Sequence, residues 1–216
     1  MNKDAADFVR RNTLPERPAL VPEIALYQAS EALPLWQASE DELERMGLPP
    51  PYWAFAWAGG QALARWILDH PEEVRGKRVF DFGSGSGLVA IAAAMAGAAE
   101  VMACDIDPFA IAAIHLNAGL NGVQLGLLDR DPLDEAGDWE IVLAGDICYE
   151  QPLAEQAFRW LQSLAARGAA VYLGDPQRTY TPRSGLTRVA HYAVPTTKAI
   201  EDSDLRNASV WRVEPA

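Results

Sequence analysis

The sequence predicts an α/β fold in which helices cover both faces of a mostly parallel sheet. From residue 77 onwards, short apolar runs that suit strands alternate with longer runs that suit helices, which is the order that builds a parallel sheet. Near the end of the chain, residues 188–194 and 209–213 are rich in strand-forming side chains and are joined without a strong helical pattern. These two runs predict an antiparallel pair that closes the sheet.

The predicted elements follow one another in a regular order. Strands are expected at residues 78–82, 100–104, 123–127, 140–144 and 169–173. Helices are expected at residues 61–70, 88–96, 107–117 and 152–166. Pro71, Gly97 and Gly168 end three of these helices, while Asp107 and Pro108 supply the capping residue and the first position of another.

The residues before this alternation differ in character and are expected to form an accessory segment, residues 1–50, ahead of the main domain, residues 51–216. Residues 14–27 suit one short extended or helical piece, and residues 39–46 suit a short helix before a stiff run of three prolines. Trp53 and Phe55 in the aromatic stretch that follows are expected to form a hydrophobic plug.

Composition excludes several classes of protein. No run approaches the ~20 apolar residues of a membrane helix. Residues 1–11 are polar and partly acidic, unlike a signal or transit peptide, so a cytoplasmic protein without a membrane partner is expected. Cys104 and Cys148 end apolar runs, which favours buried free thiols over a disulfide. The three histidines show no ligand spacing with them, and no metal is predicted.

The net charge of −12 indicates which kind of partner the protein can bind. Nucleic-acid-binding proteins usually carry a basic face that neutralises phosphates, and this chain has no Lys/Arg cluster. A nucleic-acid substrate is therefore disfavoured, and a basic partner such as a lysine-bearing protein segment fits better. An acidity that serves solubility alone fits the charge equally well.

The strongest motif is the glycine loop with Gly83, Ser84, Gly85 and Gly87, which lies between a predicted strand and a predicted helix. Nucleotide-like ligands bind at this place in open α/β sheets. The spacing is G-x-G-x-G, whereas a dehydrogenase has G-x-G-x-x-G/A. Asp81 precedes the first glycine by two residues; its carboxylate would repel a pyrophosphate but accept a hydrogen bond from an amino group. S-adenosylmethionine (SAM), which has an ammonium and no phosphate, fits this pattern.

Acidic residues also follow the next two strands. A carboxylate after the second strand can take both ribose hydroxyls, and Asp105 and Asp107 compete for this role, with helix capping the preferred interpretation of Asp107. The same spacing suits a nicotinamide-dependent oxidoreductase. Asp129, after the third strand, either meets an adenine amino group or is a solvated loop residue.

The fourth strand ends at Ala144, where strand ends face a ligand, and Asp146 and Tyr149 follow. An aspartate and a tyrosine suit a lysine amine, through a hydrogen bond and an aromatic wall. The alternative is that Asp146 caps the next helix while Tyr149 belongs to the core. If the pair acts on an amine, Asp146 is expected to orient it rather than to deprotonate it, because a nearby carboxylate raises a lysine pKa.

These motifs together resemble the class I SAM-dependent methyltransferases over residues 52–216, and within them the family-16 protein lysine methyltransferases. The acid-x-x-aromatic motif of that family matches Asp146 to Tyr149, and its tryptophan before the first helix matches Trp57. The residues 51–61 and 81–87 look most like the enzymes that methylate a lysine of the electron transfer flavoprotein β subunit.

The resemblance implies a Rossmann-like seven-stranded sheet and a site for SAM. Asp81 and the glycine loop would bind its methionine part, Asp105 and Ile106 would frame ribose and adenine, and Trp57 would line the pocket. Asp146 and Tyr149 would hold the target lysine of a protein substrate, with the flavoprotein β subunit as the expected partner of a monomeric enzyme. Ribosomal-protein and small-amine methyltransferases share much of the pattern, and a non-catalytic SAM-binding protein is a further alternative.

Overall fold

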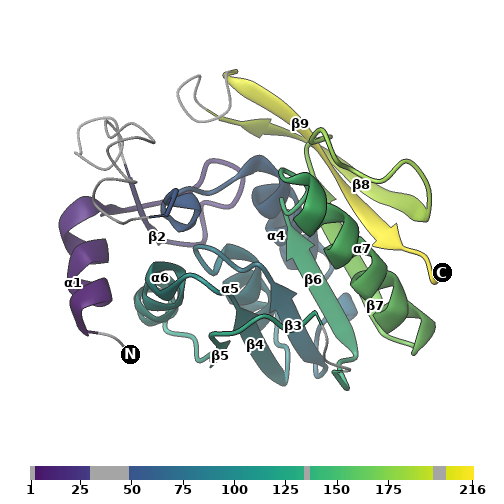
Figure 1. Cartoon of the computed structure of the whole chain (residues 1–216). Coiled ribbons are helices and arrows are strands. Elements are labelled where there is room, and N and C mark those ends of the chain that lie inside the picture. The colour runs from purple at the N-terminus through teal and green to yellow at the C-terminus, as the bar shows by residue number, and fades with distance from the viewer. Residues whose placement is uncertain (1–2, 30–48, 134–136, 197–202) are drawn as a thin grey trace.

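The computed structural model describes residues 3–29, 49–133, 137–196 and 203–216. Its centre is a seven-stranded sheet with the order β5-β4-β3-β6-β7-β9-β8 (Figure 1). The strands are β3 (Arg78–Phe82), β4 (Glu100–Cys104), β5 (Gly126–Leu128), β6 (Ile141–Gly145), β7 (Ala170–Asp175), β8 (Leu186–Pro195) and β9 (Leu205–Val213). Strands β3 to β7 pair in parallel, and β9 runs antiparallel to both β7 and β8. The predicted fold class, with its antiparallel pair, is confirmed.

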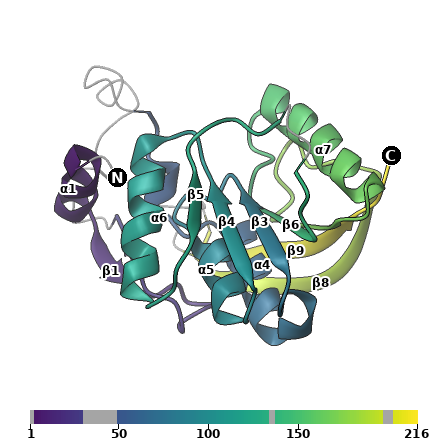
Figure 2. The same cartoon turned by 90° about the horizontal axis from the view of Figure 1, so that it is seen from below.

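Helices cover both faces of this sheet. Figure 2 shows α7 (Gln151–Ala166) on one side, and α4 (Ala58–Asp69) and α5 (Leu88–Met95) on the other. The side chains of α4, α5 and α6 (Pro108–Leu120) share one apolar core with the near face of the sheet, while α7 packs against the other face in a second core. This two-layer cover explains why the central strands consist of almost uninterrupted buried residues.

The sequence-based boundaries match most elements closely. Strands β3 and β4 have the predicted bounds, and α5, α7, β6 and β7 differ from the prediction by one or two residues at an end. The third strand was predicted too early, at residues 123–127, because Val123 and Leu125 are apolar. In the structure Gly122 has a positive φ of 65° and Val123 N bonds Ala118 O, so these residues finish the turn after α6. Pairing with β4 starts at Gly126.

The N-terminal residues pack in two places: the first helix lies on α6, whereas Val21, Ile24 and Leu26 join the main core between the helices and the sheet. Helix α1 (Lys3–Asn12), which the sequence analysis did not predict, contacts α6 through a small apolar core. The predicted single piece in residues 14–27 is instead two short antiparallel strands, β1 (Leu14–Glu16) and β2 (Leu26–Gln28). The helix predicted at residues 39–46 lies outside the described residues.

A buried asparagine connects this N-terminal part to the glycine loop. Asn117 on α6 accepts a hydrogen bond from Tyr27 N at 2.8 Å and donates to Ser86 O at 2.7 Å. A polar side chain with no exposed surface needs such partners. Strand β2 is therefore coupled to the loop that follows β3.

Other expectations concern single residues. Cys104 and Cys148 are both buried and free, as predicted. Trp53 is buried against Phe8 and Phe109 and forms the expected plug, whereas Phe55 is only half-buried beside Trp57. Among the helices of the described ranges, none combines the length and the apolar character that crossing a bilayer requires.

Candidate active site

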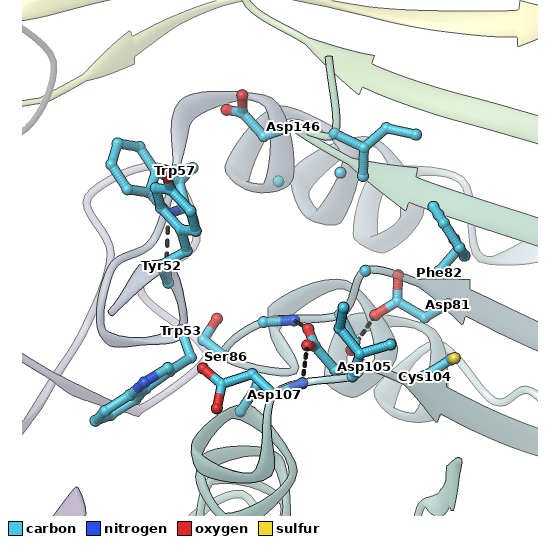
Figure 3. A pocket seen from close by; sticks show the side chains of 18 of the residues that line it. Tyr52, Trp53, Trp57, Asp81, Phe82, Ser86, Cys104, Asp105, Asp107 and Asp146 are labelled. Carbon is cyan, nitrogen blue, oxygen red and sulfur yellow. Dashed lines mark hydrogen bonds between the residues drawn. The ribbon is translucent and has the colours of Figure 1, made fainter. Parts of the chain in front are cut away.

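A cavity of about 650 Å³ lies at the carboxyl ends of β3, β4 and β6. The chain crosses from β3 to β4 on one side and reaches β6 on the other, so these strand ends diverge around a switch point where open α/β sheets bind ligands. Figure 3 shows Asp146 and Trp57 across the open centre of the cavity from Asp105 and Asp107. The site therefore has two sides, which come from different strands.

The glycine loop forms the floor between β3 and α5. Gly85 has φ of 54° and points its N–H to Asp105 Oδ2 at 2.8 Å. Gly87 has φ of 83°, and a Cβ there would lie 3.3 Å from Ile114 Cα. A side chain at either position would strain the backbone, and at Gly87 it would also push α6 away. Gly83, Ser84 and Gly85 line the cavity, while Gly87 supports the loop from behind.

Asp81, at the end of β3, is a buried carboxylate with one unused oxygen. Oδ2 accepts hydrogen bonds from Ser84 Oγ and from Ala90 N, the latter at 3.1 Å. Oδ1 has no partner among the described residues and is buried at the cavity. Burial raises the pKa of Asp81 to about 7. An unsatisfied buried carboxylate favours a cationic ligand group that donates a hydrogen bond.

Asp105 and Asp107 occupy different places. Asp105 Oδ2 accepts from Gly85 N and Oδ1 from Asp107 N at 3.0 Å, so the carboxylate is fixed at the cavity edge with lone pairs remaining for a diol. Burial raises its pKa. Asp107 Oδ1 accepts from Phe109 N at 2.8 Å and caps α6, as preferred from the sequence. Ile106 between them is 72% exposed at the mouth.

Two other predicted residues lie beside the cavity rather than in its lining. Asp129 is exposed after β5, and Asp131, two residues further, lines the cavity instead. Ala144 is fully buried within β6, and the next residue, Gly145, lines the cavity. Both differences are small displacements along the chain, because the strand ends were placed a residue too early in the sequence.

An aromatic wall faces the glycine loop. Tyr52, in the 3-10 helix η1 (Tyr52–Ala54), contacts Tyr149 with ring centroids 4.9 Å apart and Trp57 at 6.1 Å. Trp57 Nε1 donates to Tyr52 O at 2.9 Å, which fixes the indole. Tyr149 is 41% exposed and lines the mouth, so it is not a core residue. Burial, together with nearby acidic groups, raises the pKa of Tyr149 to about 12.

Asp146 is buried, and its carboxylate is held from two directions. Gly59 N, in the first turn of α4, donates to Oδ2 at 2.8 Å. Arg178 donates with Nε to Oδ1 at 2.6 Å and with Nη2 to Oδ2 at 3.1 Å. Asp146 makes no cap for α7, whose capping residue is Glu150. Its φ of 62° lies in the left-handed region, which aspartate tolerates better than most residues.

The first turn of α4 reaches Asp146 because glycines remove every Cβ in the way. A Cβ on Gly59 would lie 2.5 Å from Gly174 O, and a Cβ on Gly145 would lie 3.0 Å from Gly60 Cα. The helix end therefore touches the backbones of β6 and β7. The positive end of the helix and the Gly59 N–H stabilise the Asp146 carboxylate.

Arg178 is a functional candidate that the sequence analysis did not identify, as is Tyr52 of the aromatic wall. Arg178 lies in the loop after β7, lines the cavity, and has Cζ 5.6 Å from the Trp57 ring centroid. A signal was present, because residues that follow a parallel strand lie at the carboxyl edge of the sheet. To connect Arg178 with Asp146 from the sequence, however, one would need to know that β7 lies next to β6 in the sheet.

Comparisons with known proteins agree with this site. Residues 64–169 match the family described as ribosomal protein L11 methyltransferase (PrmA). The electron transfer flavoprotein beta subunit lysine methyltransferase of Danio rerio is 36% identical, over 97% of this chain and 83% of that protein. The protein of the same name from Mus musculus is 39% identical, over 91% and 79%. Magnesium protoporphyrin IX methyltransferase from Synechocystis PCC 6803, solved with bound SAM, shares the fold at 18% identity, over 72% of this chain and 78% of that one, with a TM-score of 0.53.

The sheet and the cavity thus define a class I SAM-dependent methyltransferase. More particularly, the chain belongs to the family of electron transfer flavoprotein β-subunit lysine methyltransferases. The residues present fit SAM: the unpaired Asp81 oxygen suits an ammonium, and the fixed Asp105 carboxylate suits a ribose diol. The nicotinamide-dependent oxidoreductase considered from the sequence is not supported.

Proposed function

We propose that this enzyme transfers methyl groups from SAM to lysine side chains of the electron transfer flavoprotein β subunit. The observation that carries the proposal is the identity of 36% to 39% with enzymes of that name over nearly the whole chain. The acidic character of the protein, with a net charge of −12, supports a basic, lysine-bearing surface as substrate.

The cofactor belongs on the side of the cavity formed by β3 and β4. Asp81 and the glycine loop would hold the methionine part, and Asp105 would hold the ribose. Trp57 faces them from the aromatic wall. SAM supplies a methyl group on a positively charged sulfonium. The protein's own contribution is to fix the two reacting groups in line, which is the main source of catalysis in such a displacement.

The acceptor belongs on the side formed by Asp146, Tyr149 and Arg178. Tyr52, Trp57 and Tyr149 give this side flat apolar surfaces that suit the methylene stem of a lysine. Asp146 and Tyr149 supply the polar groups near its end. The lysine nitrogen must be neutral to attack, so the charges around it decide how much of it is reactive at a given pH.

The same proposal keeps residues 51–216 as the catalytic domain and residues 1–50 as an accessory segment. The packing of α1 on α6, in a small core separate from that of the sheet, supports this division.

A ribosomal protein is the second candidate substrate, because residues 64–169 match the ribosomal protein L11 methyltransferase family. That match contains Asp81, Asp105 and Asp146. It contains neither Trp57 of the aromatic wall nor Arg178. The match also contains Tyr149, so it covers residues of both the cofactor side and the acceptor side. The flavoprotein β subunit is favoured because the similarity to the flavoprotein enzymes extends over 91% to 97% of the chain and so includes Trp57 and Arg178.

The test is methyl transfer from tritiated SAM to purified electron transfer flavoprotein and, in parallel, to ribosomal protein L11. We expect label on the flavoprotein β subunit and none on the ribosomal protein. Asp146→Asn should lose most of the activity while SAM binding persists, as measured by calorimetry. Asp129→Asn is the matched control, because it removes an exposed carboxylate that does not line the cavity.

Label on ribosomal protein L11 alone would replace the proposed substrate. Label on neither protein, in an enzyme that binds SAM, would overturn the proposal. Unchanged activity in Asp146→Asn would show that the acceptor side is wrongly assigned.

A further inference from the structure

The ion pair between Asp146 and Arg178 has the geometry of a fixed pair. Two parallel hydrogen bonds join the guanidinium to the two carboxylate oxygens, at 2.6 Å and 3.1 Å. The side chains are only 4% exposed for Asp146 and 18% exposed for Arg178. Bidentate, charge-assisted pairs of this kind are both stronger and more directional than a single contact.

The loop that carries Arg178 is anchored as firmly as its side chain. Asp175 Oδ1, at the buried end of β7, accepts hydrogen bonds from Gln177 N at 2.6 Å, Arg178 N at 3.0 Å and Thr181 Oγ1 at 2.6 Å. Thr181 Oγ1 also lies 2.8 Å from Arg178 O. Gln177 has a φ of 64°, an unusual conformation for a residue other than glycine, which these bonds hold in place.

Trp57 completes the cage around the guanidinium. Its ring centroid lies 5.6 Å from Arg178 Cζ, within the range of a cation–π contact. An incoming lysine would have to break two side-chain bonds and this contact to take the place of Arg178, and would leave a second buried cation beside it. The geometry therefore favours an Arg178 that stays paired while the substrate binds.

A fixed pair changes what Asp146 does to the acceptor. Alone, a buried carboxylate would raise the pKa of a nearby lysine ammonium and keep it protonated. When Asp146 is paired with Arg178, the two side chains together have no net charge, so the pair does not raise the pKa of the lysine in this way. We propose that Arg178 is a positioning residue of the reaction, which acts through Asp146 to keep the acceptor amine neutral.

This inference rests on the proposed function. The step it concerns is the loss of one proton from the lysine ammonium to water. That loss frees the nitrogen lone pair to form the N–C bond as the C–S bond breaks and its electron pair stays on sulfur. The pair of side chains neither gains nor loses a proton itself.

Other titratable groups face the same region. Cys148 and Tyr149 come from the loop of Asp146, Asp175 from the end of β7, Tyr52 from η1, and Asp105 from the end of β4. Burial raises the pKa values of the Cys148 thiol and the Tyr149 hydroxyl far above neutrality, so neither ionises in the working range. Asp81 also lines the cavity on the cofactor side, and saturating SAM keeps its state constant.

The experiment compares pH profiles of kcat/KM for the flavoprotein β subunit, at saturating SAM, in four enzymes: wild type, Arg178→Met, Asp146→Asn, and the double variant. Arg178→Met leaves a lone carboxylate, and its acidic limb should move up by about one to three pH units. Asp146→Asn leaves a lone guanidinium, and its limb should move down. The double variant has no charge at either of the two positions, and its acidic limb should return toward that of the wild type.

Arg178→Lys keeps the charge and should keep the limb near its wild-type position. A second readout is independent of turnover. With S-adenosylhomocysteine bound, the ε-carbon shift of a ¹³C-labelled lysine in the bound β subunit reports the pKa of the amine directly. That pKa should follow the same order across the variants. Thermal unfolding and SAM affinity identify any variant that is misfolded. Because Asp146→Asn is expected to lose most of its turnover, the pKa of the bound lysine carries the comparison for this variant and for the double variant.

Wild-type turnover with limbs in the predicted order supports the inference. If the wild-type enzyme methylates the β subunit but its acidic limb coincides with that of Arg178→Met, the inference is overturned and the proposed function stands. A wild-type enzyme that labels no β-subunit lysine overturns the proposed function, and this inference with it.

Discussion

Asp81→Asn tests how the cofactor site is built. Asparagine has the same shape, and its oxygen can still accept the bonds from Ser84 Oγ and Ala90 N. Its NH₂ group would occupy the place of Oδ1, the oxygen that has no partner among the described residues. The change removes one buried charge and creates a donor where a cation should bind. We expect a more stable ligand-free protein that binds SAM poorly.

The magnitude follows from the pKa of Asp81. Burial raises it from 3.8 to about 7, so the folded protein holds a proton that the unfolded chain has lost. The unfolding free energy therefore falls as pH rises from about 4 to 7 and remains low above. A shift of about three units corresponds to about 4 kcal/mol at most. In Asp81→Asn this decline is absent, and above pH 7 the variant should be the more stable protein.

The assay combines urea unfolding between pH 5 and pH 8 with calorimetry of SAM binding. For wild type, the SAM Kd should fall about tenfold from pH 6 to pH 8, as Asp81 ionises. At pH 8, Asp81→Asn should bind SAM at least tenfold more weakly than the wild type, since a charge-assisted hydrogen bond is lost. Asp129→Asn, an exposed carboxylate, is the control. A variant that binds SAM like the wild type, or loses stability with pH in parallel with it, would refute the reasoning.

Three further substitutions test the neighbouring contacts. Asn117→Ala should lower the unfolding free energy by about 2 kcal/mol and weaken SAM binding, because it leaves the buried Ser86 carbonyl unpaired; urea unfolding and calorimetry show whether both change. Gly59→Ala should cost about 1–3 kcal/mol in urea unfolding, because its Cβ meets Gly174 O; wild-type stability would contradict the described approach of α4. Asp105→Asn should weaken SAM binding at least tenfold, whereas Asp107→Ala should cost about 1 kcal/mol as a lost helix cap with little change in affinity; the reverse pattern would exchange their roles.

The sequence predicted what local patterns determine. The apolar runs of β3 and β4 are framed by charged residues and a glycine loop, so their bounds were found without error. Asp107 with Pro108 marked the start of α6, because a capping residue followed by proline is also a local pattern. Strand β5 was misplaced because Val123 and Leu125 pack on the core from a turn, and an apolar side chain alone does not distinguish a strand from a buried turn.

Properties that depend on distant parts of the chain could not be predicted. The partner of Asp146 lies 32 residues further along the sequence and reaches it because β6 and β7 are adjacent. The role of Gly59 depends on the backbone of Gly174, which no local pattern reveals. Helix α1 was missed because its short, largely polar sequence becomes stable only by packing on α6.

The most direct test of the central claim is peptide mapping by mass spectrometry of electron transfer flavoprotein incubated with the enzyme and deuterated-methyl SAM. The account predicts labelled methyl groups on the side-chain nitrogen of β-subunit lysine, present with wild type and Asp129→Asn and nearly absent with Asp146→Asn. Intact flavoprotein without label, beside an enzyme shown by calorimetry to bind SAM, would contradict it.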